Sequence, residues 1–454
     1  MLKNFNRILF ILSLVMIMGP VLSAQISSEN IRPKINSPIS RFGLGNISNG
    51  YFTAAGAMGG YSAAFVDPYH LNMQNPASLA FLRSTAFEVG MDTKVTALEG
   101  SNNQSDNFLG GNLNYLALGF PIKNPLNQAL DRINSPWQIG MAVSLTPYSN
   151  VGYDVTTYSG NDETGSVLNV LKGTGGTYRI NWGGGIRYKN IAAGATLGYH
   201  FGQIINSRLV AYDTLSYSYY TEFRDDMTVN GFVWKAGIQY IHEFKSTNDG
   251  KKELNGKRII AGVFGNNSTN FTTFNTSFVK RENVFATFTS VDTISYETDI
   301  EGTGVLPTEL TFGLAYEQAN KFRLGVDYQI GKWSQYQNSV KPDVLVDSWR
   351  LSVGGEFIPD IISYNNYFQR IRYRAGFYTG TDPRTIQGSQ LKYSAVTLGF
   401  GLPIIMPRQM VSFVDLGFEI GQYGVQDILT ERYFNFTLGL TLNDNSWFFK
   451  RKFN

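Results

Sequence analysis

The feature that most constrains this chain is a repeated two-residue alternation of apolar and polar side chains in its C-terminal half. In the stretch RLGVDYQI, from Arg323 to Ile330, Leu, Val, Tyr and Ile alternate with Arg, Gly, Asp and Gln. Successive side chains of a β-strand point to opposite faces, so this period predicts strands with one apolar and one polar face. The stretch YFNFTLGLTL, which ends at Leu442, is the last of the series.

The alternation predicts fourteen strands along the chain. They cover residues 83–97, 109–121, 136–147, 176–188, 191–203, 231–243, 258–270, 305–317, 321–333, 345–357, 368–379, 390–402, 410–421 and 431–443. The connections alternate between tight turns and long segments at 148–175, 204–230 and 271–304. Two connections of the short set, 122–135 and 244–257, are longer than this scheme expects.

Two fold classes fit this pattern, a membrane barrel and a large secreted all-β sandwich or propeller. Aromatic residues make up 14% of the chain, and charged residues only 16%, against roughly 25% in ordinary soluble domains. Aromatic residues near strand ends, long strands, an even strand number and short turns opposite long connections favour the barrel. We therefore predict an all-β, transmembrane antiparallel barrel of about 14 strands.

The first 24 residues predict export. Lys3 and Arg7 precede an apolar run from Ile8 to Met18, and small residues at Ser23 and Ala24 provide a cleavage site. This pattern is typical of a signal peptide, because the run is shorter than the roughly 20 residues that span a bilayer. Without cysteine there is no disulfide or thiolate metal site, and a net charge of +3 gives no footprint for nucleic acid. We expect an integral outer-membrane protein of a Gram-negative bacterium, with no cofactor and no metal.

Ahead of the first strand lies a segment with almost no charge, GLGNISNGYFTAAGAMGGYSAAFVDPYHLNMQNPASLA, at residues 43–80. Its glycines and alanines allow tight turns and close packing, and its scattered large apolar residues argue against simple disorder. We predict a leader and hatch at 25–82, the barrel at 83–443 and a basic periplasmic tail at 444–454. The alternative for the segment is a disordered periplasmic leader.

This segment resembles the hatch of the long-chain fatty acid outer-membrane transporters (FadL-type). The likeness rests on Gly43 and Gly45, on the small residues that precede Asp67, and on Asn75-Pro76-Ala77 before the first strand. The stretches DYQIGKWSQY and YRAGFYTG also look like later strands of that family. The resemblance indicates a divergent member from a Bacteroidetes-like group of outer-membrane barrels. It implies a plugged barrel that moves a hydrophobic substrate to a lateral opening. The residues that it marks as hatch or ligand candidates are Gly43, Gly45, Phe52, Met58, Phe65, Asp67, Asn75, Pro76 and Ala77.

The predicted lumen face differs between the two halves of the barrel. Inward positions of the third to fifth strands are small, and we interpret them as a free channel: Gly140, Ala142, Gly183, Gly185, Gly194 and Gly198. Inward positions of the later strands carry charges of both signs that should pair when buried: Arg323, Asp327, Arg350, Glu356, Arg372, Arg374, Asp415 and Glu419. The alternative for these charges is a network that only braces the wall.

The predicted function is transport of hydrophobic small molecules across the outer membrane. The alternatives are a protein-interaction barrel, such as a shuttle-like component of type IX secretion with a bound cargo protein, and a structural barrel without ligand. An enzyme is disfavoured because none of the three histidines accompanies a nucleophile motif. The expected partners are membrane lipid, a hydrophobic ligand and the barrel-assembly machinery, with no nucleic acid.

Overall fold

A computed structural model describes residues 36–100, 105–123, 128, 132, 135–161, 165–212, 219–248, 251–283, 290–406 and 410–445. The predicted signal peptide, the leader up to residue 35 and the tail beyond Asn445 lie outside the described residues. No helix in the described part is long and apolar enough to cross a membrane.

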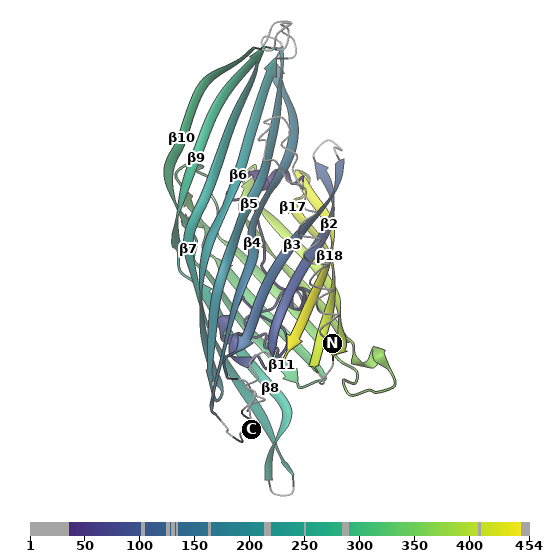
Figure 1. Cartoon of the computed structure of the whole chain (residues 1–454). Helices are drawn as coiled ribbons and strands as arrows, with labels where there is room; N and C mark the ends of the chain where they lie inside the picture. Colours follow the sequence, from purple (N-terminus) through teal and green to yellow (C-terminus); the bar gives the residue numbers. More distant parts are fainter. Residues whose placement is uncertain are drawn as a thin grey trace, which may run out of the picture. The chain divides into compact units, whose positions relative to one another are not determined.

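The chain forms one antiparallel sheet that closes on itself (Figure 1). Its long strands are β2 (Thr85–Gly100), β3 (Ser105–Pro121), β4 (Trp137–Asn161), β5 (Gly165–Tyr188), β6 (Ile191–Tyr212), β7 (Tyr219–Asn248), β8 (Lys251–Asn266), β9 (Thr269–Asn283), β10 (Ser290–Leu306), β11 (Glu309–Gln318), β12 (Phe322–Gly331), β14 (Ser348–Phe357), β15 (Arg372–Ile386), β16 (Ser389–Met406), β17 (Met410–Val425) and β18 (Leu429–Asp444). Closure is between β18 and β2, from Leu429 opposite Gly100 to Asp444 opposite Thr85.

The predicted 14-stranded barrel is confirmed. β8 and β9 together extend along β7, and β10 and β11 extend along β9 and β8, so each of these two pairs forms one interrupted barrel strand. The alternation places the side chains as expected. In β12, Arg323 and Asp327 are buried inside, whereas Leu324 is 59% exposed on the outer face. An apolar outer face over a polar interior is the reverse of a water-soluble sandwich and suits a bilayer.

Three segments predicted as long connections are strands instead. The described residues within 148–175, 204–230 and 271–304 belong to β4 to β7, β9 and β10, and Asn161 pairs with Gly165 in the first of these segments. Figure 1 shows these strands rising above the ends of β2, β3, β17 and β18, and we call this the upper end. The segments continue the strand spacing with Thr, Tyr and Val, which favour β-structure, and each is stabilised by its equally long partner. Likewise, β7 and β8 extend into 244–257, where Asn248 pairs with Lys251.

Residues 36–82, which we call the N-terminal segment, run inside the barrel from the upper to the lower end. Their elements are η1 (Pro38–Arg41), β1 (Asn46–Ile47), α2 (Thr53–Gly56) and η2 (Pro76–Phe81). At the upper end the Ser37 amide donates to the Gly152 carbonyl of β4, and at the lower end η2 packs on β4, β5 and β6. Three short elements complete the described secondary structure: η4 (Trp333–Gln335), β13 (Gln337–Asn338) and η5 (Tyr367–Arg370).

Candidate functional site

The barrel wall is open along part of one seam, between β3 and β4. These strands pair over only six residue pairs, from Leu116 opposite Leu145 to Pro121 opposite Gly140. Above Leu116, no pairing joins the described parts of the two strands. The seam parts within the apolar outer belt, because Leu109 and Leu113 of β3 are 67% and 44% exposed there. We call this opening the β3–β4 gap.

The N-terminal segment covers the free edge of β4. Ser48 donates its amide to the Tyr148 carbonyl at 2.8 Å, and β1 pairs with Ser149 and Asn150. Higher up, the Gly152 amide donates to the Ser40 hydroxyl at 3.0 Å. Unpaired backbone groups are costly in an apolar environment, so these bonds replace the strand that is missing from this edge.

A β-bulge lies on β3 where the two strands part. Gly90 of β2 is opposite Tyr115, whereas Met91 is opposite Leu113, so Asn114 is the extra residue. A bulge bends its strand and changes the direction of nearby side chains. Tyr115 consequently points inward, where its ring stacks on Phe52 with 4.0 Å between the centroids and its hydroxyl donates to Thr53 Oγ1.

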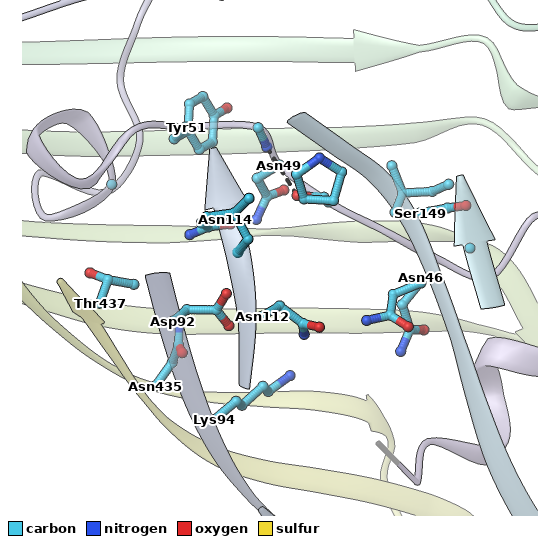
Figure 2. A pocket seen from close by; sticks show the side chains of 18 of the residues that line it. Asn46, Asn49, Tyr51, Asp92, Lys94, Asn112, Asn114, Ser149, Asn435 and Thr437 are labelled. Atoms are coloured by element: carbon cyan, nitrogen blue, oxygen red, sulfur yellow. Dashed lines mark hydrogen bonds between the residues drawn. The ribbon is translucent and has the colours of Figure 1, made fainter. Parts of the chain in front are cut away.

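A cavity of about 780 Å³ lies beside the gap. β2, β3 and β18 contribute polar side chains to it, and the N-terminal segment and β4 line it from the other side (Figure 2). The register brings these strands together, because Asp92 is opposite Asn112 of β3 and Thr437 of β18. The lining also includes Leu113 and Tyr178, whose side chains are exposed on the outer face. The cavity therefore continues through the gap to the outside of the wall.

Two buried polar atoms of the cavity lining have no hydrogen-bond partner among the described residues. They are Asn435 Oδ1, an acceptor, and Arg350 Nη1, a donor. The rest of the Arg350 guanidinium is held, since Nε donates to Ser352 Oγ and Nη2 to the Gly59 carbonyl, and the group stacks on Tyr378. Buried polar groups normally have partners, so these two atoms mark positions where a bound molecule or water is expected.

The predicted free channel along the small residues is not present. A Cβ at Gly140 would lie 2.0 Å from the Leu79 carbonyl oxygen, and one at Gly194 would lie 2.4 Å from the Pro76 carbonyl carbon. Gly185 meets the same backbone, and Gly183 lies under Leu79. The glycines make room for η2 and not for a ligand. Ala142 is fully buried in the core beside Leu79, and Gly198 lines a smaller cavity of about 140 Å³.

Five of the eight predicted charges form one buried network around the N-terminal segment, at the lower end of the barrel. At its centre is Asp67, a predicted hatch residue, which accepts hydrogen bonds from Arg323 and Arg372 at 3.0 and 2.9 Å. Arg374 binds Glu356 and Asp415, and Arg323 also contacts Glu356 at 3.3 Å. The other members are His70, Glu317 and Arg258. The network joins the segment to β8, β11, β12, β14, β15 and β17.

The other three predicted ion-pair residues form no salt bridge within the described structure. Asp327 accepts the amides of Ser62 and Ala63, and Glu419 accepts the hydroxyls of Tyr378 and Tyr433. Arg350 has the contacts given above. Backbone amides and tyrosine hydroxyls can donate hydrogen bonds to a buried carboxylate, which then needs no cation beside it. The sequence period shows only which face of the strand a residue occupies, and not which partner it meets.

His70 lies between two carboxylates of this network. Its Nε2 is 3.0 Å from Asp415 and its Nδ1 is 3.3 Å from Asp67. Burial lowers the pKa of His70, but the two carboxylates outweigh burial and raise this pKa to about 9. Burial likewise raises the pKa of Asp67, but Arg372, His70 and Arg323 hold it well below its usual range. The charged forms of both groups therefore attach the N-terminal segment to the wall.

A family model described as BamG matches residues 1–454. The chain belongs to the BamG family. Among solved structures, this BamG-family chain is similar to a Pseudomonas aeruginosa FadL homologue, at TM-score 0.54 and 11% identity over 86% of this chain and 98% of that chain. It is also similar to the Pseudomonas putida toluene transporter TodX, at TM-score 0.53 and 15% identity over 88% of this chain and 99% of that chain. No curated protein matches the sequence.

At these identities the likeness shows the fold alone, and it agrees with the expected FadL-type barrel architecture. The Bacteroidetes-like grouping stays a prediction.

None of the nine predicted hatch or ligand residues of this BamG-family chain lines the large cavity. Gly43 and Gly45 turn the segment with positive φ, Phe52 stacks on Tyr115, and Met58 and Phe65 are buried in the core. Asn75 caps η2 by accepting the Ala77 amide, and Pro76 lies against Gly185 and Gly194. Asp67 belongs to the ion network. These residues hold the segment in place.

Sequence reasoning missed the polar residues of the cavity, chiefly Asp92, Asn112, Asn114 and Asn435. The stretch GNLNYL in β3 alternates asparagine with leucine, and that spacing was the available signal. It does not show that the neighbouring strand is displaced, because pairing partners far apart in the sequence decide that.

Proposed function

We propose that this BamG-family barrel resides in the outer membrane and passes hydrophobic small molecules sideways between its cavity and the outer leaflet, through the β3–β4 gap. The observation that carries this proposal is the break in pairing above Leu116 and Leu145, next to the cavity and inside the apolar belt. Unpaired strand edges are costly in hydrocarbon unless they line a cavity or are covered by protein. A break in pairing within the apolar belt is therefore consistent with a functional opening.

A lateral path also fits the closed lower end. There η2 packs directly on the glycines of β4, β5 and β6, and the buried ion network attaches Asp67 and His70 to the wall. β5 pairs with β6 from Val167 opposite Tyr212 to Tyr188 opposite Ile191. Passage straight down the lumen would therefore require the packing of η2 on these strands to break. The gap offers a route that leaves it intact.

The test is to close the gap chemically. The chain has no cysteine, so the pair Leu113→Cys and Pro147→Cys can be bridged selectively by a bismaleimide. Both residues line the cavity, one on each edge of the gap. Cells that express the bridged protein should accumulate radiolabelled oleate or toluene no faster than cells without it.

The control pair is Leu118→Cys and Val143→Cys, which are paired just below the gap. Bridging this pair should leave uptake unchanged. Equal uptake with and without the bridge across the gap would contradict the proposal.

A second candidate function is an accessory role in the β-barrel assembly machinery. The observation that favours it is the family match over the whole chain, because the family name points to that machinery. Affinity purification from mildly cross-linked native membranes should then recover assembly-machinery subunits in a fixed ratio to this protein. Recovery no greater than with an unrelated barrel of equal abundance would exclude it.

A further inference from the structure

We propose that the cavity beside the gap binds the head of an amphiphile, and that this head is uncharged and rich in hydroxyl groups, such as a sugar. The tail would leave through the β3–β4 gap into the outer leaflet. This inference rests on the proposed passage through the gap, and it replaces a purely hydrophobic substrate by one with a specific polar end.

The lining of the cavity has a large hydrogen-bonding capacity. Asparagines from four elements contribute to it: Asn46, Asn49, Asn112, Asn114, Asn150 and Asn435. Each carboxamide offers two donor hydrogens and an acceptor oxygen. A hydrocarbon would displace water from these groups and leave them unsatisfied, at a cost in free energy. A molecule with several hydroxyls can both donate and accept, and so satisfies such a wall.

The two unpartnered atoms of the lining match the donors and acceptors of a hydroxyl-rich head. Asn435 Oδ1 can accept from a hydroxyl, and Arg350 Nη1 can donate to one. The Arg350 guanidinium is held by Ser352, the Gly59 carbonyl and the Tyr378 ring, and the backbone of Asn435 is fixed in the paired part of β18. A free donor on a fixed side chain, together with a free acceptor carried by a paired strand, organises part of the site before the ligand arrives.

The charged residues of the lining are balanced. The charged residues of the lining are Asp92 and Glu419, against Lys94 and Arg350, so the formal charges cancel. Glu419 is occupied by two tyrosine hydroxyls, and Lys94 lies over the Tyr433 ring at 4.0 Å. No excess of cations is present to hold a carboxylate or phosphate head. The balance favours a neutral head over the anionic head of a free fatty acid.

The gap itself provides the apolar part of the site. Leu109 and Leu113 are exposed along the β3 edge, and Tyr178 is 43% exposed on the other side. Leu113 and Tyr178 also line the cavity, which places apolar surface where the head region opens to the membrane. An alkyl chain would extend the outer belt at this point.

The experiment compares three twelve-carbon probes on the purified protein in phospholipid nanodiscs. They are dodecyl maltoside with a neutral sugar head, laurate with an anionic head, and dodecane with no head. We expect saturable binding of radiolabelled dodecyl maltoside that excess laurate or dodecane displaces poorly. Asn435→Leu and Asn112→Leu, which keep the branched side-chain shape but remove its polar atoms, should each weaken this binding about three- to tenfold.

The matched control is Asn107→Leu, an exposed asparagine of the same strand outside the cavity, which should bind like the original chain. Heat-modifiable migration in gels verifies that each variant is a folded barrel. Tighter binding of laurate than of dodecyl maltoside, or equal binding by Asn435→Leu and Asn107→Leu, would overturn the inference.

The outcomes separate this inference from the proposed function. If hydrocarbon uptake depends on an open gap but the sugar-headed probe does not bind, the inference fails and the proposed passage stands. If bridging the gap changes nothing, the passage itself fails.

Mass spectrometry of polymer-extracted native membranes then identifies the source of a bound amphiphile: a glycolipid retained by the original chain and lost in Asn435→Leu comes from the membrane. Absence of such a lipid, with probe binding intact, indicates capture from outside.

Discussion

At the scale of single residues, the small side chains of the barrel wall are explained by what packs on them. Gly140, Gly185 and Gly194 approach the backbone of η2 so closely that a Cβ would overlap it. Glycine is used here for close approach of two backbones and not for conformational freedom. The same contact excludes a ligand from this part of the lumen.

Replacing Gly194 by leucine should therefore displace η2 and destabilise the protein by about 1–3 kcal/mol, the usual cost of overpacking. Urea unfolding followed by tryptophan fluorescence measures the change, and limited proteolysis detects a released N-terminal segment. Gly184→Leu is the control, because a Cβ there has no neighbour closer than 3.9 Å. Equal effects of both substitutions would contradict the packing described here.

His70 makes stability depend on pH. Its pKa is raised to about 9 in the folded chain, above the ordinary value of about 6.5. Its contribution is therefore fully present below pH of about 6.5 and is lost as pH rises through about 9, with a size of about 3 kcal/mol. The urea midpoint should fall over this range in the original chain and fall much less in His70→Gln. His242→Gln, at an exposed position near the lower end of β7, should keep the original slope.

At the scale of elements, the N-terminal segment takes the place of β3 beside the upper part of β4. The chain from Asn36 to Ser48 supplies donors and acceptors to the carbonyl and amide groups that β3 would otherwise meet. The bulge at Asn114 turns β3 away, and the Phe52–Tyr115 stack fills the angle between strand and segment. The β4 edge of the gap is thus covered by the N-terminal segment, whereas the β3 edge faces the cavity.

Ser40→Ala tests this substitution. Ser40 is fully buried and its hydroxyl both accepts the Gly152 amide and donates to carbonyl oxygens, so its loss leaves a buried group unpaired at a cost of about 1–3 kcal/mol. Hydrogen exchange at the Gly152 amide should become at least about tenfold faster. Ser48→Ala keeps the backbone bond to Tyr148 and should leave this exchange unchanged. Protection that survives in Ser40→Ala would show that other contacts cover this edge.

At the scale of the whole molecule, the barrel and the N-terminal segment form one compact unit. The ion network around Asp67 links the N-terminal segment to strands from β8 to β17, which are widely separated in sequence. Removing one partner of a buried ion pair leaves an uncompensated charge and costs about 3–5 kcal/mol. Loss of any single partner in the network should therefore destabilise the attachment of the N-terminal segment to the wall.

Deleting residues 43–80 should turn the closed barrel into an open pore. A 14-stranded barrel without its filling has a lumen wide enough for water and ions. In planar bilayers we expect stable conductance steps from the deletion variant and none from the full chain. Lipids that co-purify with the full chain should also be lost. A silent deletion variant that still migrates as a folded barrel would show that the wall closes without the segment.

Much of the fold was predictable because its signal is local. The two-residue period identifies the strands and their inner and outer faces, so residues such as Arg323 and Leu324 were placed correctly. The charged inner face also predicted buried pairing, and Arg323, Glu356, Arg372, Arg374 and Asp415 do pair. The upper strand extensions were missed because Thr- and Tyr-rich segments become strands only when an equally long partner lies beside them.

The sequence alone determined that this chain forms an antiparallel barrel with an apolar outside, a polar inside and a tightly packable N-terminal segment. Only the tertiary structure decided what fills the lumen, where the wall opens and which asparagines face the cavity. The physical reason is that periodicity reports on which face a side chain lies, whereas packing and pairing depend on contacts between distant residues. Gly194 under Pro76 and Asn112 beside the β3–β4 gap have the same periodic signal, and only their neighbours make one a packing contact and the other a binding surface.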